Sequence, residues 1–277
     1  MTRVDMTDPR GAAVEVRGGA LRFGERTLWS GLDLDVAPGE FLAVLGPNGS
    51  GKTSLLRVLL GLQPLSAGTV TVAGRPPGRG SGNGNERVGY VPQQRAMDDG
   101  LTLRGRDLVG LGLDGHSWGF GLRGLRRRGR LIDSAIEAVG ATDYADSPVG
   151  RLSGGEQQRL RVAQALIGEP AVLLCDEPLA SLDLTHQRIV AGLIDERRRA
   201  TNTAVLFVTH EINPILSAVD RVLYLVDGQF RIGPPDEVMT SETLSELYRS
   251  RVEVLRVGGQ IHVAGAQSAL CEDEVHH

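Results

Sequence analysis

The stretch GPNGSGKTS, Gly46 to Ser54, contains the only lysine of this 277-residue chain, whose other 29 basic residues are all arginine. An apolar run (EFLAVL, 40–45) precedes it, and the segment from Ser54 to Leu60 is expected to start a helix. A Gly-x-x-x-x-Gly-Lys-Thr pattern between a strand and a helix is typical of a phosphate-binding loop. A compact ammonium fits inside such a loop, where the planar fork of an arginine would crowd the backbone.

The loop predicts how a nucleotide and its metal ion are held. Glycines let successive backbone N–H groups point at phosphate oxygens, and the helix N-terminus adds partial positive charge. Lys52 is expected to reach the β- and γ-phosphates, and Thr53 to hold Mg²⁺. All nine residues are candidate nucleotide contacts: Gly46, Pro47, Asn48, Gly49, Ser50, Gly51, Lys52, Thr53 and Ser54.

A second apolar run, residues 171–175, ends in the adjacent carboxylates Asp176 and Glu177. Neighbouring side chains of a strand point to opposite faces. We therefore expect Asp176 to face Mg²⁺ and Glu177 to face an attacking water. The alternative is that the pair only caps the following helix. Cys175, inside the run, is expected to be a core residue with no reactive thiol.

The segment LSGGE contains a capping box, in which Ser153 and Glu156 satisfy the first N–H groups of a helix that runs to about Ile167. Gly154 and Gly155 leave the N-terminus of this helix without side chains. An anion can therefore approach the N–H groups closely. This segment predicts a second phosphate-binding surface, unless it is a capping box alone.

These motifs, in this order, resemble the nucleotide-binding subunit of ABC transporters over residues ~13 to ~250. The resemblance implies binding and hydrolysis of ATP with Mg²⁺, and it makes residues 46–53 the Walker A loop. Asp176 becomes the Walker B aspartate, Glu177 the catalytic base, and residues 152–156 the family signature.

Further positions are assigned by the same resemblance. Gln93 in GYVPQ matches the loop that senses Mg²⁺ and the membrane partner, and His210 matches the switch histidine near the γ-phosphate. Ser181 to Asp183 match the D-loop, and Phe23 matches the aromatic residue that stacks on adenine. The departures are Glu156 where glutamine is commoner, Phe23 where tyrosine is commoner, and Ala180 before the D-loop serine.

The expected fold is α/β, a P-loop NTPase of the ABC ATPase type. Apolar strands that alternate with helices predict a mostly parallel sheet core covered on both faces. An antiparallel β subdomain is expected from strands at 13–18, 20–24, 32–36 and 68–73, and a helical insertion at about 94–168. Another helix is expected between His210 and Arg221. Three parts follow: an N-terminal tail (1–12), the ATPase domain (13–250), and a C-terminal hairpin with tail (251–277).

Composition limits the functions further. The net charge of −4 argues against nucleic acid as a partner, and two distant cysteines argue against a disulfide framework. The N-terminus has no apolar core of the kind a signal peptide has, and no stretch approaches the ~18 apolar residues of a membrane span. We expect a protein that is soluble by itself and is held at the cytoplasmic face of the cell membrane by a permease.

The resemblance implies that two copies meet head to tail around ATP and drive a membrane permease, which an extracytoplasmic substrate-binding protein supplies. Residues 210–248 resemble the importer branch for metal ions, zinc or manganese. Cassettes for iron-chelate or corrinoid uptake, and a soluble ATPase of iron–sulfur cluster assembly, remain alternatives. The tail 271–277 has metal-binding side chains but also fits an acidic solvated tail. The arginine run 123–130 fits either a lipid- or permease-facing surface or a plain exposed helix face.

Overall fold

The computed structural model describes residues 11–77, 88–93, 102–114, 125–180 and 182–265. The D-loop residue Ser181, Arg123 of the arginine run, residues 94–101 and 115–124 of the expected helical insertion, and the tail 271–277 lie outside the described residues.

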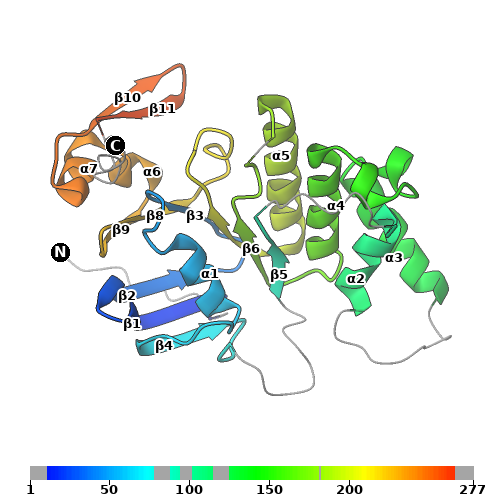
Figure 1. Cartoon of the computed structure of the whole chain (residues 1–277), viewed down its shortest axis with the longest axis horizontal. Helices are drawn as coiled ribbons and strands as arrows, with labels where there is room; N and C mark the ends of the chain where they lie inside the picture. Colours follow the sequence, from blue (N-terminus) through cyan, green and yellow to red (C-terminus); the bar gives the residue numbers. More distant parts are fainter. Residues whose placement is uncertain (1–10, 78–87, 94–101, 115–124, 181, 266–277) are drawn as a thin grey trace, which may run out of the picture.

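A six-stranded sheet forms the centre of the molecule (Figure 1). Its strand order is β5-β6-β7-β3-β8-β9; the first five strands are parallel, and β9 pairs antiparallel with β8. The prediction of a mostly parallel core is therefore confirmed. The strands are β3 (Phe41–Leu45), β5 (Val88–Val91), β6 (Val172–Asp176), β7 (Ala204–Val208), β8 (Arg221–Val226) and β9 (Gln229–Gly233).

The central strands have almost no polar residues because both of their faces are covered. In β3, Leu42 and Val44 lie in one hydrophobic cluster, while Phe41, Ala43 and Leu45 lie in the other. Successive side chains of a strand point to opposite faces, so each central strand contributes to both cores. Cys175 of β6 is fully buried in this way, and burial raises the pKa of its thiol. It is a core residue, as predicted.

The first core, the cluster that contains Leu42 and Val44, packs against an antiparallel sheet of order β2-β1-β4 and against the helix α1. The stretches 13–18 and 20–24, expected as two strands, form the single strand β1, with register shifts between Val16 and Leu21. Helix α1 begins at Lys52, two residues before the expected start, because the left-handed Gly51 is its N-cap. The elements are β1 (Val14–Phe23), β2 (Arg26–Val36), β4 (Ala67–Val72) and α1 (Lys52–Leu59).

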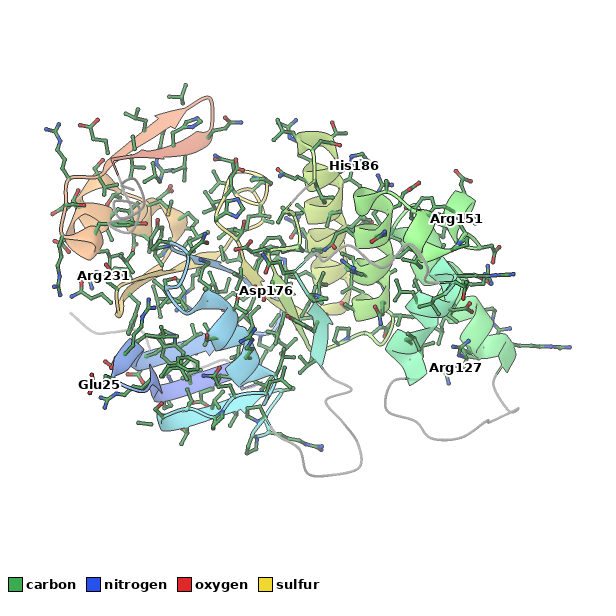
Figure 2. All side chains as sticks on the ribbon, in the orientation of Figure 1. Glu25, Arg127, Arg151, Asp176, His186 and Arg231 are labelled. Atoms are coloured by element: carbon green, nitrogen blue, oxygen red, sulfur yellow. The ribbon has the colours of Figure 1, made fainter. Side chains whose placement is uncertain are left out.

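The second core packs against helices. Helices α2, α3 and α4 contact one another, and α4 also contacts α5 and β5 (Figure 1). Several arginines of the run 123–130 are exposed on α3, and Figure 2 shows Arg127 directed away from the molecule. The elements are α2 (Gly105–Asp114), α3 (Leu125–Ala138), the 3₁₀ turns Thr142–Tyr144 and Val149–Arg151, α4 (Gly154–Leu166) and α5 (Leu184–Thr201).

The prediction of a helix between His210 and Arg221 is wrong. Residues 212–218 form successive turns with i+3 hydrogen bonds, such as Ile215 N to Ile212 O (3.0 Å) and Ala218 N to Ile215 O (2.8 Å). Pro214 explains the difference, since a proline disfavours the helical conformation of the residue before it.

The C-terminal hairpin is confirmed. Strands β10 (Glu253–Val257) and β11 (Gln260–Ala264) pair antiparallel. Gly258 and Gly259 close them with φ angles of 59° and 78°, as a two-residue type I′ turn requires. Two short helices, α6 (Pro235–Val238) and α7 (Ser241–Tyr248), lie between β9 and the hairpin.

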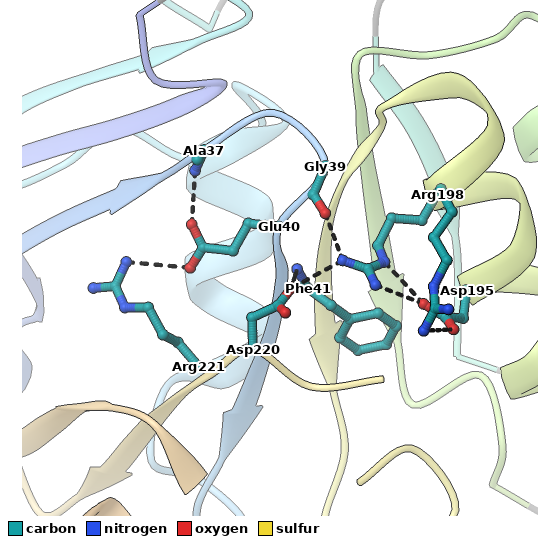
Figure 3. Close-up of polar contacts among 9 residues, drawn as sticks. Ala37, Gly39, Glu40, Phe41, Asp195, Arg198, Asp220 and Arg221 are labelled. Atoms are coloured by element: carbon teal, nitrogen blue, oxygen red, sulfur yellow. Dashed lines mark hydrogen bonds and ion pairs between the residues drawn. The ribbon is translucent and has the colours of Figure 1, made fainter. Parts of the chain in front are cut away.

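A polar network fixes α5 to the starts of β3 and β8 (Figure 3). Arg198 donates to the carbonyl of Gly39, to Asp220 (2.9 Å) and to Asp195 (2.9 Å), and its guanidinium lies 5.9 Å from the centre of the Phe41 ring. The side chain of Arg198 is only 9% exposed, whereas that of the next residue, Arg199, is 64% exposed.

We expect Arg198→Met to lower the free energy of unfolding by about 2–4 kcal/mol, because it leaves acceptors without their donor at a partly buried site. Arg199→Met is the matched control, since Arg199 pairs with the same Asp195 at the surface. It should cost less than about 1 kcal/mol. Urea unfolding of both variants measures the difference. Equal losses would show that burial of Arg198 adds nothing.

Candidate nucleotide-binding site

The predicted phosphate loop joins β3 to α1, which is the strand and helix context expected from the sequence. Gly46 and Gly51 have φ angles of 139° and 100°. A Cβ atom on Gly46 would lie 2.0 Å from the carbonyl oxygen of Leu225, and one on Gly51 would lie 2.8 Å from Nε1 of Trp29. Both positions therefore need glycine for conformation and for space.

Lys52 folds back over this loop. It is 5% exposed, and its Nζ donates to the carbonyls of Gly46 (2.7 Å) and Pro47 (2.9 Å). Burial lowers the pKa of Lys52, while the nearby Glu177 and Asp176 act in the opposite direction. An ammonium has three protons, so two bonds to the loop leave one for a phosphate oxygen.

Thr53 and Asp176 meet at the end of β6. Thr53 Oγ1 donates to Asp176 Oδ1 over 3.0 Å, and Asp176 is 3% exposed. Burial raises the pKa of this carboxyl, an effect that the bond from Thr53 reduces. Figure 2 shows Asp176 near the middle of the molecule, between the antiparallel sheet and α5. A hydroxyl beside a buried carboxylate is the hard oxygen donor set that Mg²⁺ prefers, so these residues fit that ion.

The backbone of Glu177 differs from the strand conformation that the sequence predicted. Strand β6 ends at Asp176, and Glu177 has a left-handed backbone with φ of 47°. Its side-chain direction therefore comes from this turn and not from strand alternation. The amide N–H of Glu177 donates to the carbonyl of Val208 over 3.0 Å. A left-handed non-glycine residue costs about 1–2 kcal/mol, and such strain is concentrated at functional sites.

Two predicted residues lie next to the Glu177 carboxylate. Gln93 Nε2 donates to Glu177 Oε2 over 3.3 Å, and His210 Nδ1 lies 3.9 Å from the same oxygen. They follow β5 and β7, the two neighbours of β6 in the sheet. The carboxyl ends of parallel strands meet at one edge of a sheet, which is where ligands of such sheets bind. A cavity of about 110 Å³ beside Glu177 and His210, lined also by Thr209 and Gln187, has room for water.

The signature segment has the predicted capping box. Ser153 N donates to Glu156 Oε2 (2.8 Å), and Glu156 N donates to Ser153 Oγ (3.4 Å). Gly154 is the first residue of α4. Gly155 lies against His186. A Cβ atom added to Gly155 would lie 3.3 Å from the His186 ring, which is closer than an ordinary van der Waals contact.

Asp183 is the N-cap of α5 and lies near the signature segment. Its side chain accepts from the amides of Thr185 (2.9 Å) and His186 (3.0 Å), and these bonds lower its pKa. His186 Nδ1 is also 2.6 Å from Asp183 Oδ2. Since His186 also lies against Gly155, one side chain links the D-loop aspartate to the signature. Among the described residues, no hydrogen bond or ion pair joins these two segments to the phosphate loop.

Phe23 ends β1 and is 51% exposed, so it is accessible to a ligand from solvent. Two residues that the sequence analysis missed brace the phosphate loop from the neighbouring strand β2. Arg26 Nη2 donates to the carbonyl of Gly49 (3.2 Å), and the buried Trp29 packs on Gly51. Neither has a local sequence signal, because each contact joins segments brought together only by folding.

Among the residues that the structure describes, no helix is long and apolar enough to span a bilayer. No cluster of three or more His, Cys, Asp or Glu side chains within the described ranges is arranged to hold a metal ion.

A phosphate loop, a Thr–Asp pair for a hard cation and a carboxylate beside a cavity with room for water define a P-loop ATPase. The family model described as "ABC transporter" matches residues 29–180. The chain belongs to this family, as its ATP-binding, ATP-hydrolysing domain.

Similar proteins cover most of the chain. It is 38% identical to the zinc import ATP-binding protein ZnuC of Cereibacter sphaeroides, over 74% of this chain and 76% of that protein. It is 40% identical to the aliphatic sulfonates import ATP-binding protein SsuB 1 of Pseudomonas fluorescens, over 79% and 75% of the two chains. A solved structure described as an inward-facing conformation of a putative metal-chelate type ABC transporter has a TM-score of 0.76 and 26% identity, over 91% of this chain and 96% of that chain.

Proposed function

We propose that this ATPase subunit drives import of a metal ion, zinc or manganese, through a membrane permease. The observation that favours it is the 38% identity to zinc import ATP-binding proteins of two organisms, Cereibacter sphaeroides and Roseobacter denitrificans. Iron-chelate or corrinoid uptake is the second candidate, favoured by the structural likeness to a metal-chelate type transporter. The sulfonate-importing relative is why the cargo needs its own test.

ATP would bind with its phosphates over the loop 46–54 and its adenine on the exposed ring of Phe23. The left-handed glycines and the N-terminus of α1 direct backbone N–H groups at the phosphates. Lys52, already fixed by two loop carbonyls, would donate its remaining N–H to oxygens of the β- and γ-phosphates.

Thr53, Asp176 and Gln93 are the residues that would hold Mg²⁺. When bound, the ion neutralises charge on the β- and γ-phosphates. The raised pKa of Asp176, which burial causes, fits a carboxylate that a cation would keep ionised.

Hydrolysis would depend on Glu177. Its carboxylate, beside the cavity, would orient or deprotonate the attacking water, while Lys52 and His210 stabilise charge on the transferred phosphoryl group. Gln93 would keep the carboxylate in place through the 3.3 Å hydrogen bond.

A second copy would complete each site. Among the described residues, no hydrogen bond or ion pair joins the segment from Ser153 to Glu156 to the phosphate loop of the same chain. In the head-to-tail homodimer that we propose, these signature residues would act on the ATP of the partner. The N-terminus of α4 with its two glycines provides the N–H groups for that phosphate. Asp183 would contact the nucleotide at the same interface.

The helical insertion at about 94–168, reached through Gln93, would transmit closure of the dimer to the permease at the cytoplasmic face of the membrane. A substrate-binding protein outside the cell would deliver the cargo. The soluble alternative, an ATPase of iron–sulfur cluster assembly, predicts that no permease co-purifies with the chain.

The cargo is tested by the zinc, manganese and iron content of cells whose only copy is Glu177→Gln, grown in metal-poor medium beside wild type. We expect a selective fall in zinc or manganese that adding the same ion reverses. A fall confined to iron would favour the second candidate. Unchanged content of all three metals would contradict metal import.

A further inference from the structure

The turns after His210 are attached to the C-terminal hairpin by one side chain. Asn213 Nδ2 donates to the carbonyl of Ile261 over 2.9 Å, and the amide N–H of Ile261 donates to Asn213 Oδ1 over 2.8 Å. The two partners are 48 residues apart in sequence, and Ile261 is 4% exposed. Both groups of the carboxamide are used, so its orientation is fixed by its partners.

Asn213 takes the place of a neighbouring strand. In an antiparallel pair, the N–H and C=O of one residue point to the same edge. Both backbone groups of Ile261 bind Asn213, so this edge of β11 faces away from β10. The side-chain amide thus satisfies an otherwise unpaired strand edge.

The hairpin is itself held from the other side. The amide N–H of Val254 donates to Ser241 Oγ over 2.8 Å, and Arg256 pairs with Asp236 over 2.8 Å. Ser241 and Asp236 belong to α7 and α6, not to the turns after His210. The hairpin can therefore act as a fixed support for Asn213.

The side chain of His210 makes few contacts of its own, so its position depends on the flanking backbone, where Thr209 Oγ1 donates to the carbonyl of Glu211 (3.0 Å) and accepts from the N–H of the same residue (3.2 Å). The His210 side chain is 62% exposed, and its 3.9 Å approach to Glu177 is longer than a hydrogen bond. The backbone before it is fixed by Thr209, whose N–H donates to the carbonyl of Val44 (3.2 Å). On the other side, the buried Ile212 and the bonded Asn213 fix the chain within three residues.

We propose that Asn213 is a positioning residue for ATP hydrolysis, which uses the C-terminal hairpin as a support to hold His210 beside Glu177. This rests on the proposed function, specifically on the role of His210 at the γ-phosphate. The hairpin thereby becomes part of the catalytic apparatus without touching the nucleotide.

The test is steady-state hydrolysis of Mg-ATP by the full chain carrying Asn213→Ala. We expect kcat to fall about tenfold with KM for ATP within about twofold of wild type, since misplacing a group costs rate more than binding. Asn213→Asp is the second variant, because it keeps the shape but presents an oxygen to the carbonyl of Ile261. It should show the same separation of kcat from KM.

Arg251→Ala is the matched control. It removes a side-chain bond to Glu253 of the same hairpin (2.6 Å), but this bond is exposed and anchors the hairpin to no other helix or turn. We expect its kcat to stay within about twofold of wild type. If Arg251→Ala and Asn213→Ala lower kcat equally, the effect is not specific to the support of His210 and the proposal is overturned.

A second readout is the interaction with His210. In single-turnover assays, adding Asn213→Ala to His210→Ala should change the residual rate of hydrolysis by less than about twofold. The reason is that Asn213 acts through the His210 side chain, which His210→Ala has already removed. Multiplied losses would overturn the proposal. If wild type hydrolyses ATP and the Asn213 variants hydrolyse it equally well, this inference alone is refuted. If wild type has no ATPase activity, both the proposed function and this inference are refuted.

Discussion

Glu177→Gln is expected to lower the rate of ATP hydrolysis by about 10²–10⁴-fold, the range attributed to a positioned general base. The carboxylate lies beside a cavity with room for water and accepts a hydrogen bond from Gln93. Glutamine keeps the size of the side chain but cannot take a proton. ATP binding should survive, because the contacts of Lys52 and Thr53 are untouched, and ATP-bound homodimers should accumulate.

Phosphate release measures the rate, and size-exclusion chromatography with Mg-ATP measures the dimer. Glu211→Gln is the matched control, since Glu211 lines the same cavity but is exposed and two residues beyond Thr209. Its hydrolysis rate should stay close to that of wild type. Normal turnover by Glu177→Gln would remove Glu177 from its role, and loss of ATP binding would point to a structural one.

Lys52→Arg is expected to weaken ATP binding by about 10–100-fold, although the formal charge is unchanged. The ammonium of Lys52 lies in a buried position, within 2.9 Å of two carbonyl oxygens of its own loop. A guanidinium is wider and planar, and it would have to push the loop apart or leave it. Either outcome displaces the N–H groups that we propose bind phosphate.

Calorimetric titration with a non-hydrolysable ATP analogue and Mg²⁺ measures this affinity. Arg57→Lys is the matched control: it exchanges the same two residue types in the last turn of α1, at an exposed position. That variant should bind the analogue as wild type does. Wild-type affinity in Lys52→Arg would show that the loop does not discriminate between the two cations.

The sequence alone predicted the features that depend on short-range chemistry. The phosphate loop follows from glycine and lysine spacing, and the capping box from Ser153 and Glu156, three residues apart in one turn. The continuous apolar strands predicted a sheet covered on both faces, because a strand with two buried faces does not alternate apolar with polar residues. The two-glycine turn of the hairpin is equally local. Each of these patterns is set by backbone geometry over a few residues.

The tertiary structure decided what lies next to what. Glu177 is aimed by a left-handed turn, which the strand pattern did not predict, and the chain after His210 forms turns because Pro214 opposes a helix. Arg26 reaches Gly49, and Asn213 pairs with Ile261. These contacts join segments 23 and 48 residues apart, so only the packing of the sheets, and no local pattern, brings them together.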